Sequence, residues 1–576
     1  MGYIEMKTNV SKLQKLIDKT IPGITVSPKD DCVVLTGEVS DYQDLFQAGK
    51  IAAETKDFYG VINKITLKGY TPAPERKPKI KDKSLDGLKL DVLVIGGGVI
   101  GSAILRELSK YKLNTLLVEK EEDLAMQASG RNDGCVHMGA DLHPGQKKLS
   151  YLQRAVKMYP QMCKELEVDY RLDGQTVGFD TAILKPFVKF YLKHKARKNK
   201  IPGLRILSRK KLLELEPNLS KSIKFGANFP SAGVVCPYGL TIALAESAVI
   251  NGAKVKLNTY VESMKVKDHK IISVKTNRGT VYPRVVVNAA GVFSDVIADM
   301  ADDQFFTIHP RKGTDTIMDK SKTKDLSRTG ITVFKVGSTK KTHSKGGGII
   351  PTIDLNILVG PDAIEQPERE DFTTCKANVD KIFDKHKETI DKLSERDIIT
   401  YFSGIRAATY EEDFVVQKGK WTTNIVHAAG IQSPGLTAAP AIAQDIAKFT
   451  VEELGGATPN KKFNPIRKNV VQTRNLSDEA RDKLIKSNSD YGKIICRCEE
   501  ISKGEIIDSI HSVIPPTTTD GIKRRVRAGM GRCQGGFCQP LVAQILAEET
   551  GKKLTDICKK GTGKIMYRDT KGEQNA

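Results

Sequence analysis

The chain of 576 residues has 91 Lys and Arg against 69 Asp and Glu, a formal net charge of +22, and a hydrophobic fraction of 39%. This length predicts about three or more globular units, the composition excludes a disordered chain, and no apolar run reaches the roughly 18 residues of a membrane-spanning helix. The lysines lie in short scattered groups with one Trp, so the charge indicates a solvated surface and not a nucleic-acid partner.

The first residues predict neither export nor lipidation. They have no apolar core of a signal peptide, and Met6 stands where a myristoylation signal has Ser or Thr. We therefore expect a cytoplasmic protein, whose lysine-rich surface allows peripheral association with the anionic inner face of a membrane. The cysteines outside the last portion are scattered singly, as in a reducing compartment: Cys32, Cys135, Cys163, Cys236, Cys375 and Cys558.

Residues 1–75 predict a small α+β module. Apolar and polar residues alternate in GITVSPKDDCVVLTGEV and GVINKITLKG, and SDYQDLFQAGKIAAETK between them has helical spacing with Ser40 or Asp41 as a cap. These patterns resemble a BON-like module, in which a small sheet packs on helices. Residues 76–89, rich in Pro and Lys, are expected to form an exposed linker, so that the module is dispensable for the chemistry of the next domain.

A strand, a glycine-rich turn, a helix and a second strand follow in LDVLVIGGGVIGSAILRELSKYKLNTLLVEKEE. Gly96 permits a tight turn, Gly98 lets the backbone approach a pyrophosphate, and Gly101 allows the helix to pack closely on the strand. Glu119, at the end of the second strand, can accept hydrogen bonds from a ribose and disfavours a 2′-phosphate. The pattern predicts a Rossmann-type site for FAD or NAD.

Two later strands that run into small residues favour FAD. TVYPRVVVNAAGVFSDVIADMA reaches Gly291, and NIVHAAGIQSPGLTAAPAIAQDIAKF reaches Gly430 and then Gly435 before a long helix. Small residues at both places let the backbone approach a large flat cofactor, and the second helix directs its N-terminus at the flavin oxygens. An enzyme that binds only a nicotinamide dinucleotide does not need this further glycine-rich turn between a strand and a helix.

The chain from about residue 90 to 562 resembles the FAD-dependent oxidoreductases of the D-amino-acid oxidase and glycerol-3-phosphate dehydrogenase superfamily. It is most similar to the anaerobic-type glycerol-3-phosphate dehydrogenases and their L-2-hydroxyglutarate dehydrogenase relatives. The motifs are IGGGVIGSAILRELS, ASGRNDGCVHMG, PGLRILSRKKLLELEPNLS, SAGVVCPYGLTIALAE, HPRKGTD, GIRAATYEEDFVV and GIQSPGLTAAPAIA. The resemblance implies noncovalent FAD, with Leu436 and Thr437 beside it, and a Rossmann-type FAD-binding domain with an inserted mixed-sheet substrate domain over residues 90–470.

The stretch ASGRNDGCVHMGADLHPG lies beside the flavin in that family. Its Ser129, Asn132 and Gly134 match the small and polar residues around the cofactor. His137 matches a family histidine, which could accept the proton of a substrate hydroxyl while the adjacent C–H passes hydride to the flavin. A structural histidine bonded to the backbone is the alternative. Where the family continues H-A-G-Y-D, this chain reads H-M-G-A-D, which puts glycerol 3-phosphate in doubt as the substrate.

Two cationic positions match family residues at the substrate. Arg406, in YFSGIRAATYEEDF, matches an arginine that grips an anionic group, since a planar guanidinium suits a carboxylate or phosphate. An ion pair with Glu411 or Glu412 is the alternative. Arg311 and Lys312, in HPRKG, resemble the strand that passes over the flavin, where a cation could steady the reduced ring, and Lys312 is the stronger candidate.

Four cysteines gather near the end of the chain. Cys496 and Cys498 form C-x-C, and after 34 intervening residues Cys533 and Cys538 form C-x4-C. Structural zinc prefers C-x2-C, so the spacing favours a [2Fe–2S] cluster, with zinc or an empty site as the alternative. The surrounding stretches, IICRCEEISKGEIIDSI and TTTDGIKRRVRAGMGRCQGGFCQPLVAQIL, resemble the bacterioferritin-associated-ferredoxin-like domain. We expect a small, mainly helical [2Fe–2S] domain over residues 471–576.

The resemblances imply an α/β dehydrogenase with FAD and a [2Fe–2S] cluster. It would oxidise a small anionic 2-hydroxy compound, either glycerol 3-phosphate or a 2-hydroxy acid, by hydride transfer to the flavin. The cluster would then relay single electrons to a separate acceptor protein or quinone-linked partner. Two alternatives stay open: an amine or amino-acid oxidoreductase of the same superfamily, and an electron-transfer component of a larger complex without its own substrate.

Overall fold

The strand before the glycine-rich turn lies in the middle of an eight-stranded sheet in the computed structural model, which describes residues 3–334 and 347–568. This strand, β5 (Leu88–Ile95), pairs in parallel with β6 (Thr115–Val118) and β16 (Gly279–Asn288). A strand covered on both faces needs apolar side chains throughout, and β6 reads TLLV with every residue buried. The other strands are β13 (Lys254–Lys256), β14 (Val261–Lys267), β15 (Lys270–Thr276), β23 (Val415–Lys418) and β24 (Ile425–Ala429).

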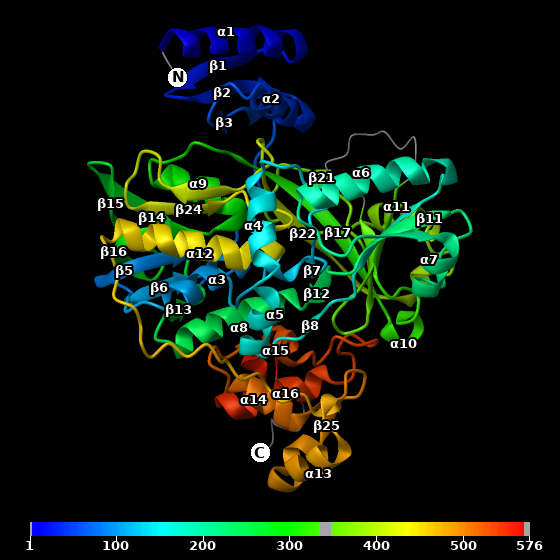
Figure 1. The fold of residues 1–576 in the computed structure, drawn as a ribbon. Coiled ribbons are helices and arrows are strands. Elements are labelled where there is room, and N and C mark those ends of the chain that lie inside the picture. Colours follow the sequence, from blue (N-terminus) through cyan, green and yellow to red (C-terminus); the bar gives the residue numbers. More distant parts are fainter. Residues whose placement is uncertain (1–2, 335–346, 569–576) are drawn as a thin grey trace.

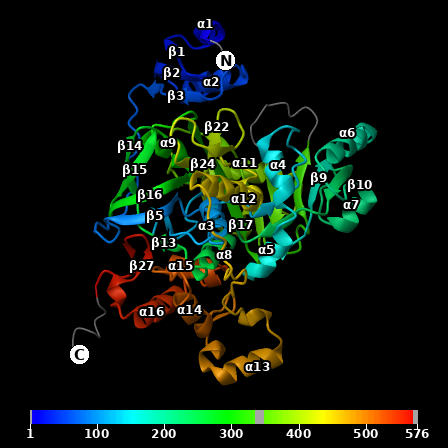
Figure 2. The same cartoon turned by 60° about the vertical axis from the view of Figure 1, so that its left-hand side comes forward.

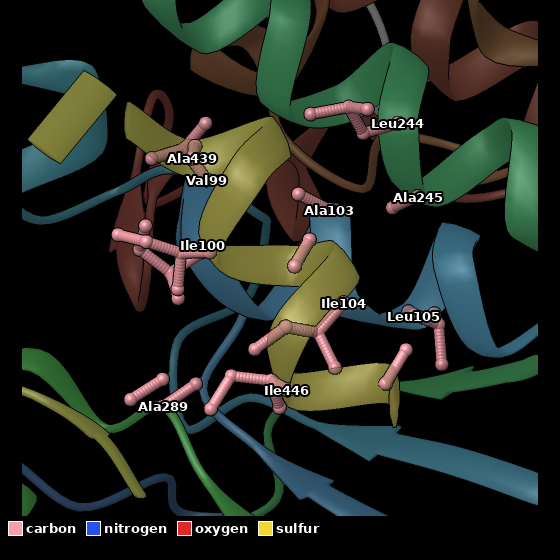
Figure 3. Packing of buried hydrophobic residues seen from close by; sticks show 14 of the residues in the cluster. Val99, Ile100, Ala103, Ile104, Leu105, Leu244, Ala245, Ala289, Ala439 and Ile446 are labelled. Atoms are coloured by element: carbon pink, nitrogen blue, oxygen red, sulfur yellow. The ribbon is translucent and has the colours of Figure 1, made fainter. Parts of the chain in front are cut away.

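Three helices cover one face of this sheet. They are α3 (Val99–Leu108), α8 (Pro237–Ile250) and α12 (Gly435–Glu453), and they form the largest apolar cluster with Val92 and Val94 of β5. Figure 3 shows Ile100 and Ile104 of α3 beside Ile446 of α12. The other face, with Leu93 and Ile95, packs against the β14–β15 hairpin and α9 (Ser294–Met300). Burial on both faces is what this parallel arrangement requires.

A second, nine-stranded sheet stands beside the first. Its order is β10 (Arg205–Ser208), β11 (Phe225–Phe229), β9 (Gln175–Phe179), β18 (Gly330–Phe334), β19 (Gly348–Pro351), β20 (Ile357–Gly360), β17 (Ile308–Met318) and β21 (Ile364–Glu365), with β22 (Ile398–Thr409) also pairing with β17. β9 and β18 are parallel and the other pairs are antiparallel, so the predicted mixed sheet is confirmed. Around it lie α6 (Lys185–Lys198), α7 (Arg209–Leu215), α10 (Lys320–Thr323) and α11 (Lys376–Lys387).

A small three-stranded sheet and two helices connect these two parts. The strands are β7 (Cys135–Val136), β12 (Gly233–Val235) and β8 (Tyr170–Arg171), and the helices are α4 (Lys147–Ala155) and α5 (Tyr159–Leu166). Because β7 directly follows the first FAD-binding strands, it carries the stretch around His137 from the first sheet toward the second.

The N-terminal module is an α+β unit, as the sequence predicted. It comprises α1 (Tyr3–Thr20), β1 (Ile24–Lys29), β2 (Cys32–Val39), α2 (Tyr42–Glu54), β3 (Val61–Asn63) and β4 (Thr66–Leu67). The side chain of Asp41 caps α2 by accepting a hydrogen bond from Gln43 N. The module lies at one end of the molecule (Figure 1), and its apolar cluster includes Tyr410, which belongs to the main body.

The predicted linker, residues 76–89, is mostly exposed, but contacts within it and just before it also hold the chain along the main body. The Tyr70 hydroxyl donates a hydrogen bond to Glu368, Arg76 lies 2.5 Å from Glu121, and Leu85 is buried. The last residues of this segment belong to β5. A Pro- and Lys-rich composition indicates a lack of secondary structure, but it does not exclude side-chain contacts with a neighbouring domain.

The C-terminal domain lies at the opposite end, as Figure 2 also shows. A cluster of apolar residues, among them Ile506, Ile522, Val542 and Leu546, joins its helices. Among the helices of the described ranges, none combines the length and apolar character needed to cross a bilayer. The domain is formed by α13 (Asp478–Ser487), β25 (Ile494–Cys496), β26 (Ile501–Ser502), α14 (Lys503–Ile510), α15 (Thr519–Val526), α16 (Gln539–Thr550), β27 (Cys558–Lys560) and β28 (Gly563–Lys564).

Candidate functional site

A cavity of about 710 Å³ lies between the two large sheets. Most of the residues predicted to bind the cofactor or substrate line it: Gly96, Gly98, Glu119, Ser129, Asn132, His137, Gly291, Arg406, Gly435, Leu436 and Thr437. Four predicted residues lie outside its lining: Gly101, Gly134, Lys312 and Gly430. One continuous cavity therefore brings together segments that are more than 300 residues apart in the sequence.

The glycine-rich turn shapes the first end of the cavity. Gly96 has φ +114°, and a Cβ on Gly101 would lie 1.9 Å from the Gly96 carbonyl oxygen, so neither position tolerates a side chain. Although Gly101 does not line the cavity, its contact lets α3 start directly behind the turn. The hydroxyl of Ser129 accepts a hydrogen bond of 2.8 Å from Val99 N at this helix start. The arrangement fits a dinucleotide whose phosphates lie at the helix N-terminus.

Glu119, at the end of β6, lines the same end of the cavity. Its carboxylate accepts hydrogen bonds from Gly97 N at 2.5 Å and Glu121 N at 2.9 Å. Burial raises the pKa of Glu119 to about 7, and these backbone donors oppose the rise. Glu75, directly before the segment expected to be a linker, also lines the cavity and accepts a hydrogen bond of 2.5 Å from the Tyr260 hydroxyl. No motif in the sequence marks Glu75.

The glycine-rich turn between β24 and α12 lies at another side of the cavity. Gly435 begins α12 and lines the cavity with Leu436 and Thr437. The Thr437 hydroxyl accepts a hydrogen bond of 3.0 Å from His137 N, so it ties α12 to the stretch that carries the histidine. Gly430 stands outside the lining with φ +63°, and a Cβ there would lie 2.7 Å from Thr409 Cγ2. These small residues leave room for a planar ring system beside the helix N-terminus.

The ASGRNDG stretch is organised by its own polar groups. Asn132 donates to the carbonyls of Ala128 and Ser129 at 3.0 Å, and its side-chain oxygen accepts from Gly134 N at 3.0 Å. Asn132 therefore fixes the loop while lining the cavity. Gly134 lies behind the loop, where a Cβ would be 2.5 Å from the Val235 carbonyl oxygen.

His137 lies between the two sheets and contacts a residue that the sequence did not indicate. Its Nδ1 is 3.1 Å from the side-chain nitrogen of Gln175 on β9. An amide nitrogen can only donate, so Nδ1 accepts this hydrogen bond and a neutral ring carries its proton on Nε2. Gln175 thus selects the tautomer and holds the ring. A lone Gln in a strand has no sequence signal for this task.

The two strands over the cavity place Arg311 and Arg406 opposite each other. They are direct partners in the β17–β22 ladder and both line the cavity. Lys312 points elsewhere, because successive side chains of a strand alternate between its faces. Its ammonium lies 2.8 Å from Asp371. The sequence favoured Lys312 over Arg311, and the register of β17 reverses that preference for a role at the cavity.

Arg406 does not form the ion pair that the sequence left open. Glu412 pairs with Arg311, at 2.5 Å, and Glu411 accepts a hydrogen bond from Val61 N. Arg406 instead donates hydrogen bonds to the carbonyl oxygens of Lys312 at 3.4 Å and Asp362 at 3.2 Å. Burial lowers the pKa of Arg406, and nearby carboxyl groups offset this only in part. An incoming anion would compensate this buried charge.

Asp315 is a candidate residue that sequence reasoning missed. It lines the cavity at 2% exposure, and its Oδ1 has no hydrogen-bond partner in the described residues. Burial, reinforced by Asp133, raises the pKa of Asp315 well above its usual range. Asp315 follows Arg311 by four residues in HPRKGTD, so strand alternation alone predicts that both face the same side. Lys148, buried and 3.8 Å from Glu412, adds a cation to the lining without any sequence signal.

The four C-terminal cysteines lie in two pairs. Cys498 Sγ is 3.9 Å from Cys533 Sγ, and Cys496 shares a hydrogen bond with Cys538. Within the described ranges, no group of three or more His, Cys, Asp or Glu side chains forms a ready site for one metal ion. Two thiol pairs nevertheless match the ligand set of a two-iron cluster, in which each iron takes two thiolates.

The backbone around the cysteines suits an anionic cluster. A Cβ on Gly531 would lie 2.2 Å from Cys498 Cβ, so only glycine fits there. The hydrogen bond with Cys538 and the backbone donors Gly529 and Glu499 lower the pKa of Cys496 to about 6, against the effect of burial. Backbone N–H groups, led by that of Phe537, also lower the pKa of Cys533. Thiolates are the form that binds iron, and such N–H groups stabilise them.

Comparisons with known proteins agree with this organisation. Residues 91–449 match the FAD dependent oxidoreductase family, residues 494–548 match the BFD-like [2Fe-2S] binding domain, and residues 8–69 match the BON domain. The residues that fit a dinucleotide and the four cysteines lie inside the first two matches. FAD and a [2Fe–2S] cluster are therefore cofactors of this chain, as the sequence predicted.

Three proteins illustrate the similarity. A glycerol 3-phosphate dehydrogenase of Caloramator mitchellensis is 37% identical over 490 residues, covering 84% of this chain and 99% of that protein. One component of the anaerobic glycerol-3-phosphate dehydrogenase of Escherichia coli strain K12 is 23% identical, covering 81% and 89%. The structure of L-alpha-glycerophosphate oxidase from Mycoplasma pneumoniae with FAD bound superposes with a TM-score of 0.60 at 27% identity, covering 66% and 98%.

Proposed function

Because the chain belongs to the FAD-dependent oxidoreductase family, we propose that it dehydrogenates a small anionic 2-hydroxy compound, with glycerol 3-phosphate as the first candidate. The observation that carries this proposal is the pair of facing guanidinium groups, Arg311 and Arg406, in the same cavity as His137. A relative at 37% identity is named a glycerol 3-phosphate dehydrogenase, which supports the choice of substrate. A 2-hydroxy acid is the second candidate.

Arg406 is the proposed ligand of the anionic group. Arg311 already has Glu365, Glu412 and Gln432 as partners, whereas Arg406 donates only to backbone carbonyl oxygens at 3.2 Å or more among the described residues. A phosphate or carboxylate could take two parallel hydrogen bonds from one planar guanidinium. Arg311 then orders this end of the cavity through its own ion pairs.

His137 is the proposed acceptor of the hydroxyl proton. FAD, when bound, supplies the acceptor for the hydride that leaves the same carbon. The imidazole must be neutral to take the proton, and Gln175 holds the ring through Nδ1. Burial raises the pKa of Asp315, which favours its protonated form, and in that form it can donate a hydrogen bond to the substrate without adding negative charge. Loss of the proton and the hydride converts the secondary alcohol to a ketone.

Met138 bears on the choice between the two substrates. It lines the cavity and packs with Phe179 and Phe229 in an apolar cluster. A methionine next to His137 narrows the space and lowers its polarity relative to the sequence pattern of the family. A phosphate needs polar surroundings, so the Met138 position is the main argument for a 2-hydroxy acid.

The test is anaerobic bleaching of the bound flavin by a panel of compounds. Glycerol 3-phosphate should bleach the flavin fastest, a 2-hydroxy acid more slowly, and amino acids not at all. Arg406→Lys keeps the charge but loses the two-pronged hydrogen bond, so kcat/KM should fall roughly tenfold or more while FAD stays bound. Bleaching by amino acids alone would favour the amine-oxidising alternative, and no bleaching by any compound would favour a purely electron-transferring protein.

We further propose that electrons leave through the cluster to a separate acceptor. Cys498 is exposed, so a cluster held there would lie near the protein surface. The relative from Escherichia coli is named as one part of an anaerobic dehydrogenase, which supports a further component. A quinone-linked acceptor would bring the protein to a membrane surface as a peripheral protein.

Cys498→Ser tests this route. The variant should lose iron, acid-labile sulfide and the paramagnetic signal of the reduced cluster, while substrate still bleaches its flavin. Reduction of a one-electron acceptor should fall at least about tenfold, because the flavin must then react with it directly. Full activity with that acceptor in the cluster-free variant would remove the relay from the proposal.

A further inference from the structure

Helix α6 (Lys185–Lys198) exposes aromatic side chains on the outer side of the nine-stranded sheet. Phe187 and Phe190 are 69% and 74% exposed, and Ile183, just before the helix, is 85% exposed. Tyr191 is exposed as well, at 49%. Residues spaced by three and four positions lie on one face of a helix, so these rings form one outward stripe.

The opposite face of α6 holds the helix on the domain. Ala196 is buried, and Val188 and Leu192 pack on an apolar cluster that contains Phe179 and Phe225. These inward side chains make the apolar contact that holds α6 on the domain. The outward aromatic side chains are not part of that contact. In both Figure 1 and Figure 2, α6 lies at the periphery of the molecule. The aromatic stripe therefore has no role in the fold of the described residues.

Positive charge borders the stripe on both sides. On helical geometry, Lys193 and Arg197 follow one flank, and Lys195 and Lys198 follow the other. Residues 181–213 contain eleven Lys and Arg residues and no Asp or Glu. Because no carboxylate interrupts these eleven cations, the charge of this stretch is of one sign.

We propose that α6 is a membrane-docking element, which lays its aromatic stripe into the interface of an anionic lipid bilayer. An interfacial helix combines aromatic or aliphatic anchors with Lys and Arg that reach the headgroups, which is the arrangement of this face. The inference extends the peripheral association proposed above, and it does not depend on the identity of the substrate.

The charge argues against a second copy of this chain as the occupant. A two-fold contact through α6 would bring the lysine flanks of both copies together, because the same patch faces itself. Like charges so close would oppose association at low salt. Nucleic acid would satisfy the lysines but would leave the aliphatic side chain of Ile183 against polar groups. An anionic membrane satisfies the cations and the apolar anchors at once.

The location of α6 fits an acceptor in the membrane. Phe229 and Met138 belong to the apolar cluster beneath α6 and also line the cavity. Docking through this helix would therefore place the His137 end of the cavity, and not the dinucleotide end, toward the bilayer.

The experiment is co-sedimentation of the FAD-loaded protein with vesicles. Wild-type protein should pellet with vesicles of equal parts phosphatidylglycerol and phosphatidylcholine, and not with phosphatidylcholine alone. Phe187→Ser with Phe190→Ser should weaken binding about tenfold or more, because the anchors are lost while the charge stays. Lys193→Glu with Lys198→Glu should weaken it at least as much, and added salt should reproduce that effect.

Matched controls come from the exposed β14–β15 hairpin. Lys265→Glu with Lys270→Glu makes the same change of net charge, and Ile272→Ser removes an exposed apolar side chain at 43% exposure. These variants should bind as wild type does. The visible spectrum of bound FAD confirms folding for each variant, whether or not a substrate has been found.

Three results would overturn the proposal. The α6 variants could bind vesicles as tightly as wild type, the hairpin lysines could matter equally, or wild type could pellet without vesicles through self-association at α6. The last result would assign the stripe to a second copy. Bleaching by substrate with unchanged vesicle binding in the α6 variants would reject this inference alone and leave the proposed function intact.

Discussion

The two small terminal domains are attached to the main body by different interactions. The N-terminal module shares an apolar core with it, since Tyr410 lies in the cluster formed by Leu13, Val33 and Phe46. The C-terminal domain contributes only Ile514 to the largest apolar cluster of the main body, and ion pairs join it further, such as those of Arg524 and Arg525 with Asp123. The N-terminal contact mainly excludes water from apolar surface. The C-terminal contact mainly pairs charges that water could solvate separately.

The N-terminal contact continues into the site. Asn63 donates a hydrogen bond of 3.0 Å to the Tyr410 hydroxyl, and Val61 N donates to Glu411. The next residue, Glu412, pairs with Arg311 at the cavity. His309, in the same strand as Arg311, stacks on Tyr410 with ring centroids 4.8 Å apart. The module therefore supports the loop that holds an arginine of the cavity.

The C-terminal contact is spread over several carboxylates of the main body. Arg527 lies 2.7 Å from Asp354, and Arg532 lies 2.6 Å from Asp319. The Tyr238 hydroxyl, on α8, is 3.3 Å from the sulfur of Met530, near the cluster ligands. The N-terminal module, which the sequence predicted to be separate, is therefore the more integrated of the two domains. The C-terminal domain contacts a mainly polar surface of the main body, which water could solvate.

Deletion should give the largest difference between the two ends. Removing residues 1–69 would expose Tyr410, Phe305 and the apolar cluster around them, so we expect loss of FAD and aggregation. Removing residues 471–576 would expose mainly carboxylates, so that truncated protein should stay soluble with its flavin. Absorbance of bound FAD and light scattering measure both outcomes. A soluble, flavin-loaded product of the first deletion would restore the independent module that the sequence predicted.

Single substitutions should have smaller effects than the deletions. Here the substitution in the C-terminal contact should cost more stability than the one in the N-terminal contact. Asp123 is 2% exposed, and Asp123→Asn would leave two buried guanidinium groups uncompensated, at a cost of about 3–5 kcal/mol in the free energy of unfolding. Tyr410→Phe keeps the ring and loses one hydrogen bond, at a cost of about 1 kcal/mol. Denaturant unfolding followed by circular dichroism compares them. Equal costs would mean that the ion pairs at Asp123 are solvated in solution.

The smallest expected effect is a pH dependence of opposite sign at the two ends. Burial raises the pKa of Asp123, but Arg525 and Arg524 lower it further, so the net pKa lies below its usual value. The stability from Asp123 is therefore present above an unfolded pKa of about 3.9 and is lost as pH falls through the folded pKa.

Burial raises the pKa of Glu411, and the backbone donor Val61 only partly opposes this. The stability from Glu411 is present below an unfolded pKa of about 4.3 and is lost as pH rises through the folded pKa. Relative to wild type, Asp123→Asn should reduce the loss of Tm that occurs as pH falls. Glu411→Gln should reduce the loss of Tm that occurs as pH rises. Parallel changes in both variants would contradict the assigned signs.

The sequence by itself determined the features that depend on a few neighbouring residues. A glycine in the tight turn before α3, an acid at the end of β6 and four cysteines at short spacings each have a local steric or chemical cause, so spacing alone predicted a dinucleotide and favoured the cluster over zinc. Tertiary structure decided which side chains meet. The register of β17 directs Arg311 and Asp315 into the cavity and Lys312 away from it, and pairing across distant strands brings Gln175 to His137. The docking of the N-terminal module was likewise decided in three dimensions, because a composition typical of a linker says nothing about which apolar surfaces two domains bury between them.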